Sequence, residues 1–401
     1  MARIEQLAFA IAALAQRFAA PFGALFLAVY ILAVGAVSWV APGSNWDMIA
    51  YAGTVFEQRT SDPVEIHTQA YAAVKERVDA GDYVVLTSDR PYRIAQAESA
   101  SNFNTMLAFY RVKVVYVELA SWLSSFMQPV DALRAISTVS FFAIGLMTLI
   151  WAADRRVLAY GPIIVALLVF CGLGDTARIV TPDLLAGLFI IGSILLFARG
   201  NDAPSAVLMV AGCLIRPDNL ALSATLLLAA IVIRRGFVAQ AIGFAVALIG
   251  GAWMAQSAGH PGWWVQMWFS YVEFVPTLAG FDPPFSIVTY AQIVVKVVVQ
   301  SLTNETWLAM VILQVGAAAV MLARGWRPQP RVAAALVALF LCELGKLFVA
   351  PQAETRTHLG YTIAGGLLLV EAIAFFAASR AGQMATDTSR RFNAAVGRAA
   401  A

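Results

Sequence analysis

The chain has 401 residues, of which 60% are hydrophobic and only 13% are charged. A soluble domain carries about 25% charged residues, so this composition excludes an ordinary soluble protein and indicates a polytopic membrane protein. The formal net charge of +3 gives no indication of a nucleic-acid partner.

The apolar runs predict an all-α polytopic membrane protein with about 10 transmembrane helices, because no strand-and-turn pattern of a barrel is present. The first run exceeds a signal-peptide core of roughly 7–15 residues and lacks a clean small-x-small cleavage site, so we expect a retained anchor. The three cysteines lie in or at the ends of apolar runs, and we expect them to be small buried hydrophobes. The predicted spans are 20–40, 133–151, 158–173, 184–198, 203–216, 219–233, 237–255, 307–323, 332–350 and 358–378.

Basic residues collect on the cytoplasmic side of membrane proteins and so predict the orientation. Ten spans place every arginine cluster on that side, together with both termini. The clusters are Arg155–Arg156, Arg199, Arg234–Arg235, the turn from Arg324 to Arg331, and the tail with Arg380, Arg390, Arg391 and Arg398.

Two further apolar runs must then lie in the interface without crossing. Residues 111–127 carry an apolar stripe at helical spacing, and 284–300 contain Lys296 within an apolar run. Interfacial helices therefore belong to two large extracytoplasmic loops, about 41–131 and 256–306. We expect residues 1–378 to form a single transmembrane domain. Residues 379–401, rich in Ala, Ser, Thr and Arg, are expected to be a disordered cytoplasmic tail.

The outer turns mix acids and bases at membrane depth, where desolvation is costly, and such charges usually face a cavity. Each of Asp47, Asp175, Asp183 and Asp218 has an alternative interpretation as a helix cap or a solvated loop charge. Glu343 and Lys346, three residues apart on one helix, are expected to pair. The outer set comprises Asp47 after the first span, Asp175, Arg178 and Asp183 in "GLGDTARIVTPDLLAGLF", Arg216 and Asp218 in "IRPDNL", Lys346, and Glu354, Arg356 and His358 in "PQAETRTHLGY".

Carboxylates and arginines on one side of a membrane suit sugar transfer from a lipid phosphate. A carboxylate can take the proton of an acceptor hydroxyl, and arginines can hold the phosphate leaving group. The substrate would be membrane-resident, as a lipid-phosphate-linked sugar is.

These residues resemble the glycosyltransferase-C superfamily, whose members are integral-membrane enzymes that use polyprenyl-phosphate or lipid-linked sugars. The resemblance lies in a carboxylate soon after the first span, a long first outer loop, the second carboxylate in "TPDLLAGLF" and the acidic-x-Arg turn before the last span. It implies that Asp47 activates the acceptor or faces a metal, that Asp183 is the second acidic position, and that Arg356 binds the donor phosphate.

Other residues are expected to assist. Arg216, Arg178 and Lys346 would join Arg356 in binding phosphate. Asp175, Asp218, Glu354, His358 and His260 would support the site. No cofactor is certain, although Asp47 and Asp183 could share a divalent metal ion, since hard cations take oxygen ligands.

The predicted function is thus a membrane hexosyl- or pentosyltransferase that acts on a glycan, lipid or protein acceptor. We expect it in a bacterial inner membrane, with the active site facing the periplasm. The main alternative is a transporter or flippase for lipid-linked saccharides. A polysaccharide polymerase or ligase is a further alternative, and it is closer in chemistry to the predicted function because it too acts on lipid-linked sugars outside the membrane. A flippase would place its site near mid-membrane on broken helices.

Overall fold

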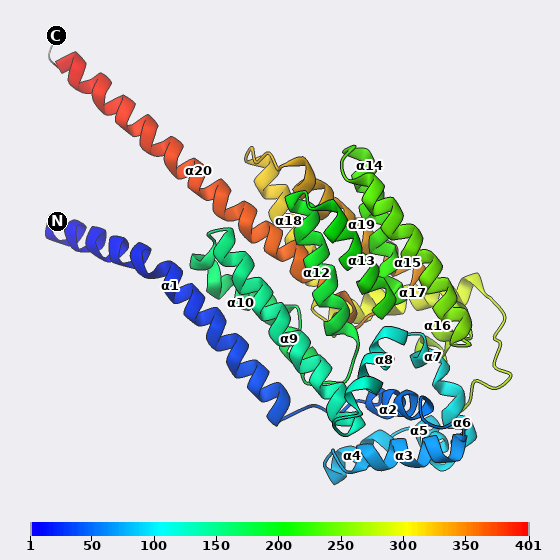
Figure 1. Ribbon diagram of the computed structural model, residues 1–401. Helices are drawn as coiled ribbons and strands as arrows, with labels where there is room; N and C mark the ends of the chain where they lie inside the picture. The colour runs from blue at the N-terminus through cyan, green and yellow to red at the C-terminus, as the bar shows by residue number, and fades with distance from the viewer. Residues whose placement is uncertain (1, 400–401) are drawn as a thin grey trace.

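The computed structural model describes the backbone of residues 2–399 and the side chains of residues 17–379. Every regular element in this part of the chain is a helix, so the prediction of an all-α protein is confirmed. The helices form an elongated bundle and a layer of short helices at one of its ends (Figure 1).

A helix lies at each of the ten predicted spans, and these ten make up the bundle. They are α1 (Ala2–Val40), α9 (Pro129–Asp154), α10 (Gly161–Phe170), α12 (Asp183–Arg199), α13 (Asp202–Ile215), α14 (Leu220–Val232), α15 (Phe237–Ser257), α18 (Trp307–Ala323), α19 (Pro330–Val349) and α20 (Leu359–Ala399).

Length separates these helices into two groups. Five segments of the described chain are long and apolar enough to cross a membrane: Arg17–Val40, Pro129–Asp154, Phe237–Ser257, Pro330–Val349 and Thr355–Ser379. A sixth is possible if α17 (Ile287–Thr303) and α18 count as one bent span. Helix α13 has 14 residues. At about 1.5 Å per residue it falls short of a hydrocarbon core of about 30 Å, so the count of ten spans is not confirmed.

Small residues let the first helix approach the bundle closely. A Cβ atom added at Gly23 of α1 would collide with the backbone of Leu158, which lies in η1 (Leu158–Tyr160), and one added at Gly161 would collide with Gly23. Helices in lipid gain little from the hydrophobic effect and depend on such close packing. The two glycines therefore bring α1 against the start of α10.

The first large loop folds into a helical layer with its own core. Helix α2 lies at its centre, because every residue from Met48 to Phe56 is buried. A helix that is apolar on all of its faces is expected only where other helices surround it. The layer comprises α2 (Asp47–Glu57), α3 (Pro63–Lys75), α4 (Ala80–Ser88), α5 (Pro91–Glu98), α6 (Ala100–Met106), α7 (Ala108–Arg111) and α8 (Val114–Leu123).

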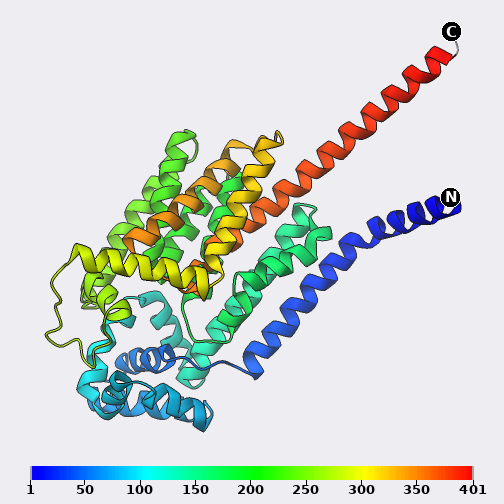
Figure 2. The ribbon, with the colours of Figure 1, turned by 180° about the vertical axis from the view of Figure 1, so that it is seen from behind.

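The predicted interfacial segments occupy the junction between this layer and the bundle. Helix α8 covers part of 111–127 and leaves the apolar side chains of Val115 and Trp122 exposed. Helix α17 lies across the end of the bundle and bends by 77° into α18 (Figure 2). Between α15 and α17, the second loop also contains α16 (Trp263–Tyr271).

The basic turns gather at the end of the bundle far from the helical layer. Ion pairs join their elements: Arg155 binds Glu371 of α20, Arg199 binds Asp154 of α9, and Arg331 of α19 binds Asp202 of α13. The outer ends of α1 and α20 project on this same side, so the chain crosses the bundle an even number of times (Figure 1).

The disorder of the segment 379–401 stays a prediction. Helix α20 continues through it to Ala399, while residues 400–401 lie outside the described residues. Alanine, arginine, glutamine and methionine have high helix propensities, and these favour extension of the preceding helix.

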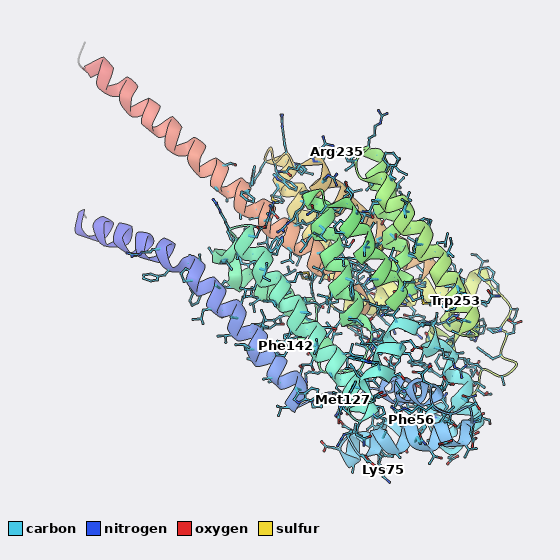
Figure 3. All side chains as sticks on the ribbon, viewed as in Figure 1. Phe56, Lys75, Met127, Phe142, Arg235 and Trp253 are labelled. Atoms are coloured by element: carbon cyan, nitrogen blue, oxygen red, sulfur yellow. The ribbon has the colours of Figure 1, made fainter. Side chains whose placement is uncertain are left out.

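The orientation in the membrane can be tested with two single cysteines. Lys75 of α3 and Arg235 of the α14–α15 turn are exposed at opposite ends of the molecule (Figure 3). In intact cells, an impermeant maleimide should label Lys75→Cys and should label Arg235→Cys only after permeabilisation. The native cysteines are buried, so their background should be low. The reverse pattern would invert the proposed orientation.

Candidate functional site

Asp47 lies where the helical layer meets the bundle and binds groups from both. Tyr110 of α7 donates to its Oδ1 at 2.9 Å, and Arg356 donates from Nη1 to Oδ2 at 2.8 Å. Arg356 lies in η3 (Thr355–His358), immediately before the last span. Its Nε also donates to Glu354 at 2.5 Å.

A second group of charges continues from Arg356 into the bundle. Asp183, the first residue of α12, lies 3.7 Å from Nε of Arg356 and pairs directly with Arg216. Arg216 in turn holds Asp218 through Nε and Nη2, at 3.0 and 3.2 Å.

Lys346 of α19 ends this group, with Nζ 3.0 Å from Asp218. Acids and bases thus alternate along six side chains, which we call the ion chain: Asp47, Arg356, Asp183, Arg216, Asp218 and Lys346.

The three aspartates lie in the first turns of α2, α12 and η2 (Pro217–Asn219), as the alternative interpretation expects, but their carboxylates make no hydrogen bond to a backbone amide there. The oxygens of Asp47 accept from Tyr110 and Arg356, and those of Asp218 from Arg216 and Lys346. Asp183 bonds the hydroxyl of Thr181 and pairs with Arg216. Each carboxylate therefore pairs with a cationic side chain, in addition to any favourable charge at its helix end.

The expected pair between Glu343 and Lys346 is wrong. Glu343 accepts a hydrogen bond from His358 Nδ1 at 2.5 Å, while Lys346 is held by Asp218. The His358 ring stacks on Trp307 with 3.7 Å between the ring centroids. His358 is therefore a fully packed part of the wall behind the site. Sequence spacing on one helix missed both partners because they come from other helices.

Two cavities meet at the pair of Asp47 and Arg356. We call the first the aromatic cavity. It has a volume of about 480 Å³ and is also lined by Lys113, Arg216 and several aromatic rings. The other, of about 770 Å³, which we call the polar cavity, is also lined by Asp175. Both cavities share Asn304, Glu305 and Glu354 as well.

The structure brings together most of the predicted site residues, with two outliers. Arg178 is exposed and donates from Nε to the backbone oxygen of Ala41 at 3.0 Å, outside both cavities. His260 is bound to Gln266 of α16, a residue that lines the aromatic cavity. Burial and the neighbouring charge of Lys113 lower the pKa of His260.

Lys113 and Tyr110 belong to the site although sequence reasoning left them out. Lys113 lies in the aromatic cavity and donates only to the backbone oxygen of Phe109, so it makes no ion pair with any described carboxylate. Burial and the charge of Arg216 lower its pKa to about 8. In the sequence, the only indication that Lys113 belongs to the site was its position outside the apolar stripe of residues 111–127.

The resting charge of Asp47 follows from opposing effects. Burial raises the pKa of its carboxyl, but the charge of Arg356 and hydrogen bonds from Arg356 and Tyr110 outweigh burial, so the pKa is below its usual value. Asp47 is therefore a carboxylate at neutral pH, with a base strength that depends on Arg356.

The two aspartates do not form a metal centre in this arrangement. The guanidinium of Arg356 approaches both Asp47 and Asp183, and a cation already faces each carboxylate. Among the side chains of residues 17–379, no cluster of three His, Cys, Asp or Glu could hold a metal ion. The donor set thus does not fit a divalent ion shared by Asp47 and Asp183.

Comparison with protein-family models, with curated proteins and with solved structures gives no match.

The ion chain makes a prediction about stability. Asp218→Asn leaves two buried cations, Arg216 and Lys346, with one fewer carboxylate, and should lower the free energy of unfolding by about 3–5 kcal/mol. The matched control is Asp154→Asn, in a pair whose carboxylate side chain is 55% exposed. It should lose about 1 kcal/mol or less. Denaturant unfolding in detergent measures both, and equal small losses would contradict the structural role.

Proposed function

We propose that this chain is an integral-membrane glycosyltransferase of the glycosyltransferase-C type, which moves a sugar from a lipid-phosphate-linked donor to an acceptor hydroxyl. The observation that carries the proposal is the pair of Asp47 and Arg356 at the junction of two cavities. A transferase must hold two substrates in contact beside a base and a phosphate-binding group. At this junction, Asp47 is suited to act as the base and Arg356 to bind the phosphate.

The aromatic cavity suits the donor. Lys113, Arg216 and Arg356 line it, and lysines and arginines are the usual partners of phosphate. Its rings come from α2, from α7 and from the second loop, where α16 also carries Trp263 and Trp264 outside the cavity lining. Tryptophan favours the headgroup layer, so a lipid tail could enter beside this helix.

The polar cavity suits the acceptor. Ser44, Asn45, Arg93 and Glu305 line it, together with Asp175, and such groups can bond the hydroxyls of a sugar or another polar acceptor. A hydroxyl placed here would lie beside Asp47, which also lines the donor cavity.

The reaction can be written with the groups present. The acceptor oxygen bonds to the anomeric carbon as the bond from that carbon to the phosphate oxygen breaks. The acceptor proton passes to Asp47, and the lipid phosphate leaves with the bonding electron pair. Arg356 stabilises the negative charge that develops on the leaving oxygen.

Donor binding would also prepare the base. When phosphate draws Arg356 away from Asp47, the carboxylate loses the charge that holds its pKa low. Asp47 then becomes a stronger base only when the donor is in place. This coupling disfavours proton uptake in the absence of substrate.

The proposed location rests on the charge pattern. The basic turns and the outer ends of α1 and α20 would be cytoplasmic, and the site would face the periplasm of a bacterial inner membrane. The acceptor could be a glycan, a lipid or a protein.

A transporter for lipid-linked saccharides is the second candidate. The 77° bend between α17 and α18 and the buried pair of Glu343 and His358 favour it, because transporters use broken helices and intramembrane charges. It would bind the same lipid but form no new glycosidic bond.

Asp47→Asn separates catalysis from structure. It should lower transfer by about 10²–10⁴-fold, as expected for loss of a positioned base, while the protein stays folded. The control is Asp62→Asn, because Asp62 caps α3 by accepting from Val64 and Asn caps equally well. Release of lipid phosphate in a lipid-donor assay measures the rate. Full activity of folded Asp47→Asn would refute Asp47 as the base and move that role to Asp183, whereas binding of the lipid donor by the native chain without any release of lipid phosphate would favour the transporter.

Lys113 should give donor binding a pH dependence. With a pKa of about 8, it is a cation below pH 8 and becomes neutral as the pH rises through this value. Donor affinity should therefore fall between about pH 7 and 9. Lys113→Arg should remove this fall, since arginine stays charged. Titration of a lipid phosphate at several pH values tests this, and identical profiles for both proteins would exclude Lys113.

A further inference from the structure

The segment between α19 and α20 carries Arg356 and depends on side chains for its shape. It covers residues 350–358, and before the short turn η3 it has no regular structure. Backbone groups that lie outside helices and away from water need other hydrogen-bond partners. We call residues 352–358 the arginine loop, and its partners decide where Arg356 lies.

Neighbouring helices supply partners to the first half of the arginine loop. The amide of Ala353 donates to the hydroxyl of Tyr271 at 3.2 Å, and its carbonyl oxygen accepts from Nε1 of Trp307 at 2.8 Å. The amide of Thr355 donates to a carboxylate oxygen of Glu305 at 2.7 Å. The start of the loop is therefore held by α16, by α18 and by the break before α18.

His358 closes the arginine loop on itself. Its Nε2 lies 3.0 Å from the backbone oxygen of Gln352, six residues earlier, and its Nδ1 lies 2.5 Å from Oε2 of Glu343 on α19. A carbonyl oxygen only accepts, so Nε2 carries a proton. A second proton lies between Nδ1 and the carboxylate, because these atoms are also within hydrogen-bond distance. The imidazole thus ties the end of the loop both to its start and to α19.

The surroundings of the imidazole make this closure rigid. His358 is only 1% exposed, and its ring lies parallel to the ring of Trp307, with an angle of 3° between the planes. Trp307 is itself fully buried. A ring that is packed on one face and bonded at both nitrogens has one orientation, so Nε2 stays on the oxygen of Gln352.

Arg356 lies inside the closed part of the chain, between Gln352 and His358. The turn η3 has four residues, and a single turn makes too few hydrogen bonds to be stable alone. The Arg356 guanidinium nevertheless reaches Asp47 at 2.8 Å and Asp183 at 3.7 Å. Its position therefore depends on the closure of the loop rather than on the turn itself.

We propose that His358 is a positioning residue for phosphate binding, which closes the arginine loop and so keeps Arg356 at the junction of the two cavities. Glu343 holds the ring in the orientation that this closure needs. The inference rests on the proposed role of Arg356 as the phosphate-binding group. His358 itself is in the lining of neither cavity, so it acts through Arg356 and does not touch the substrate. A fixed backbone lowers the entropy that Arg356 loses when it binds phosphate.

The test measures the dissociation constant of farnesyl phosphate, a short lipid monophosphate, for the full chain in a neutral detergent. The amide nitrogen of glutamine reaches the place of Nε2, whereas that of asparagine reaches the place of Nδ1. His358→Gln should therefore keep the closure to Gln352 and bind as the native chain does. His358→Asn should lose the closure and weaken binding by about fivefold, the equivalent of one lost hydrogen bond.

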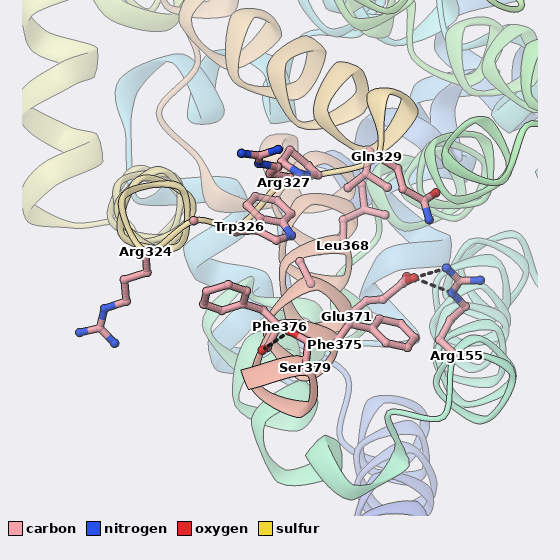
Figure 4. A pocket seen from close by; sticks show the side chains of 14 residues that line it. Arg155, Arg324, Trp326, Arg327, Gln329, Leu368, Glu371, Phe375, Phe376 and Ser379 are labelled. Atoms are coloured by element: carbon pink, nitrogen blue, oxygen red, sulfur yellow. Dashed lines mark hydrogen bonds and ion pairs between the residues drawn. The ribbon is translucent and has the colours of Figure 1, made fainter. Parts of the chain in front are cut away.

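A double variant tests whether His358 acts through Arg356. His358→Asn combined with Arg356→Ala should bind as weakly as Arg356→Ala alone, because a positioning residue has no effect once the group that it positions is gone. The matched control is Glu371→Gln, which breaks another pair of a buried glutamate, with Arg155, at the end of the bundle away from the helical layer (Figure 4). It should lower the melting temperature and leave the dissociation constant unchanged.

Three results would overturn the inference. Native affinity of folded His358→Asn would show that the closure does not matter for binding. Equal weakening in His358→Gln and His358→Asn would assign the effect to packing on Trp307 instead of the hydrogen bond to Gln352. A further loss of affinity in the double variant would show that His358 acts independently of Arg356.

The melting temperature separates this inference from the proposed function. If the native chain binds no farnesyl phosphate, the proposed donor site is wrong, but the position of Arg356 can still be read from its pair with Asp47. Asp47→Asn should then lower the melting temperature less in the His358→Asn background than in the native chain, and equal lowering would refute the positioning role. If His358→Asn does not fold, Glu343→Asp replaces it, because the shorter side chain withdraws from Nδ1. Folded Glu343→Asp should show the same losses, and native behaviour would refute the inference.

Discussion

The alternation of charge along the ion chain is the constraint on which the site depends. Asp183 and Lys346 are almost fully buried, and a lone charge at such depth is strongly unfavourable. Each is tolerable only because an opposite charge from another segment lies against it. Since the six members come from α2, η3, α12, the end of α13, η2 (Pro217–Asn219) and α19, the pairing fixes these elements relative to one another. The bundle cannot rearrange around the site without separating charges.

The same pairing gives the site a specific resting state. Every carboxylate of the ion chain already faces a cation, so no member is a free base or a free phosphate ligand. Lys113 is different, because only a backbone oxygen accepts from it. An incoming phosphate can therefore engage Lys113 first and then compete for Arg356. The transfer chemistry proposed here depends on that exchange of partners, which would free Asp47 at the moment when the donor is bound.

The two ends of the bundle differ in how their charges are arranged. At the end with the helical layer, acids and bases are buried and interlocked around two cavities. At the other end, arginines are half-buried or exposed, and some have no partner among the described side chains. Water solvates the charges at the exposed end, whereas charges at membrane depth are stabilised only by opposite charges that pair with them. The two ends of one fold thus carry their charges in two different arrangements.

The sequence alone determined the class of the protein and the sides on which its residues gather. Apolar runs located all ten bundle helices, since burial in lipid demands long apolar stretches, and arginine placement separated the two ends. The shared side of Asp47, Asp183 and Arg356 followed from the same reasoning. Only the tertiary structure decided which charges pair. Glu343 and Lys346 are neighbours on one helix, yet each binds a group from another helix, because ion pairs depend on distances between segments that no local pattern encodes. For the same reason Lys113, Tyr110 and the meeting of two cavities at Asp47 were visible only once the helices had packed.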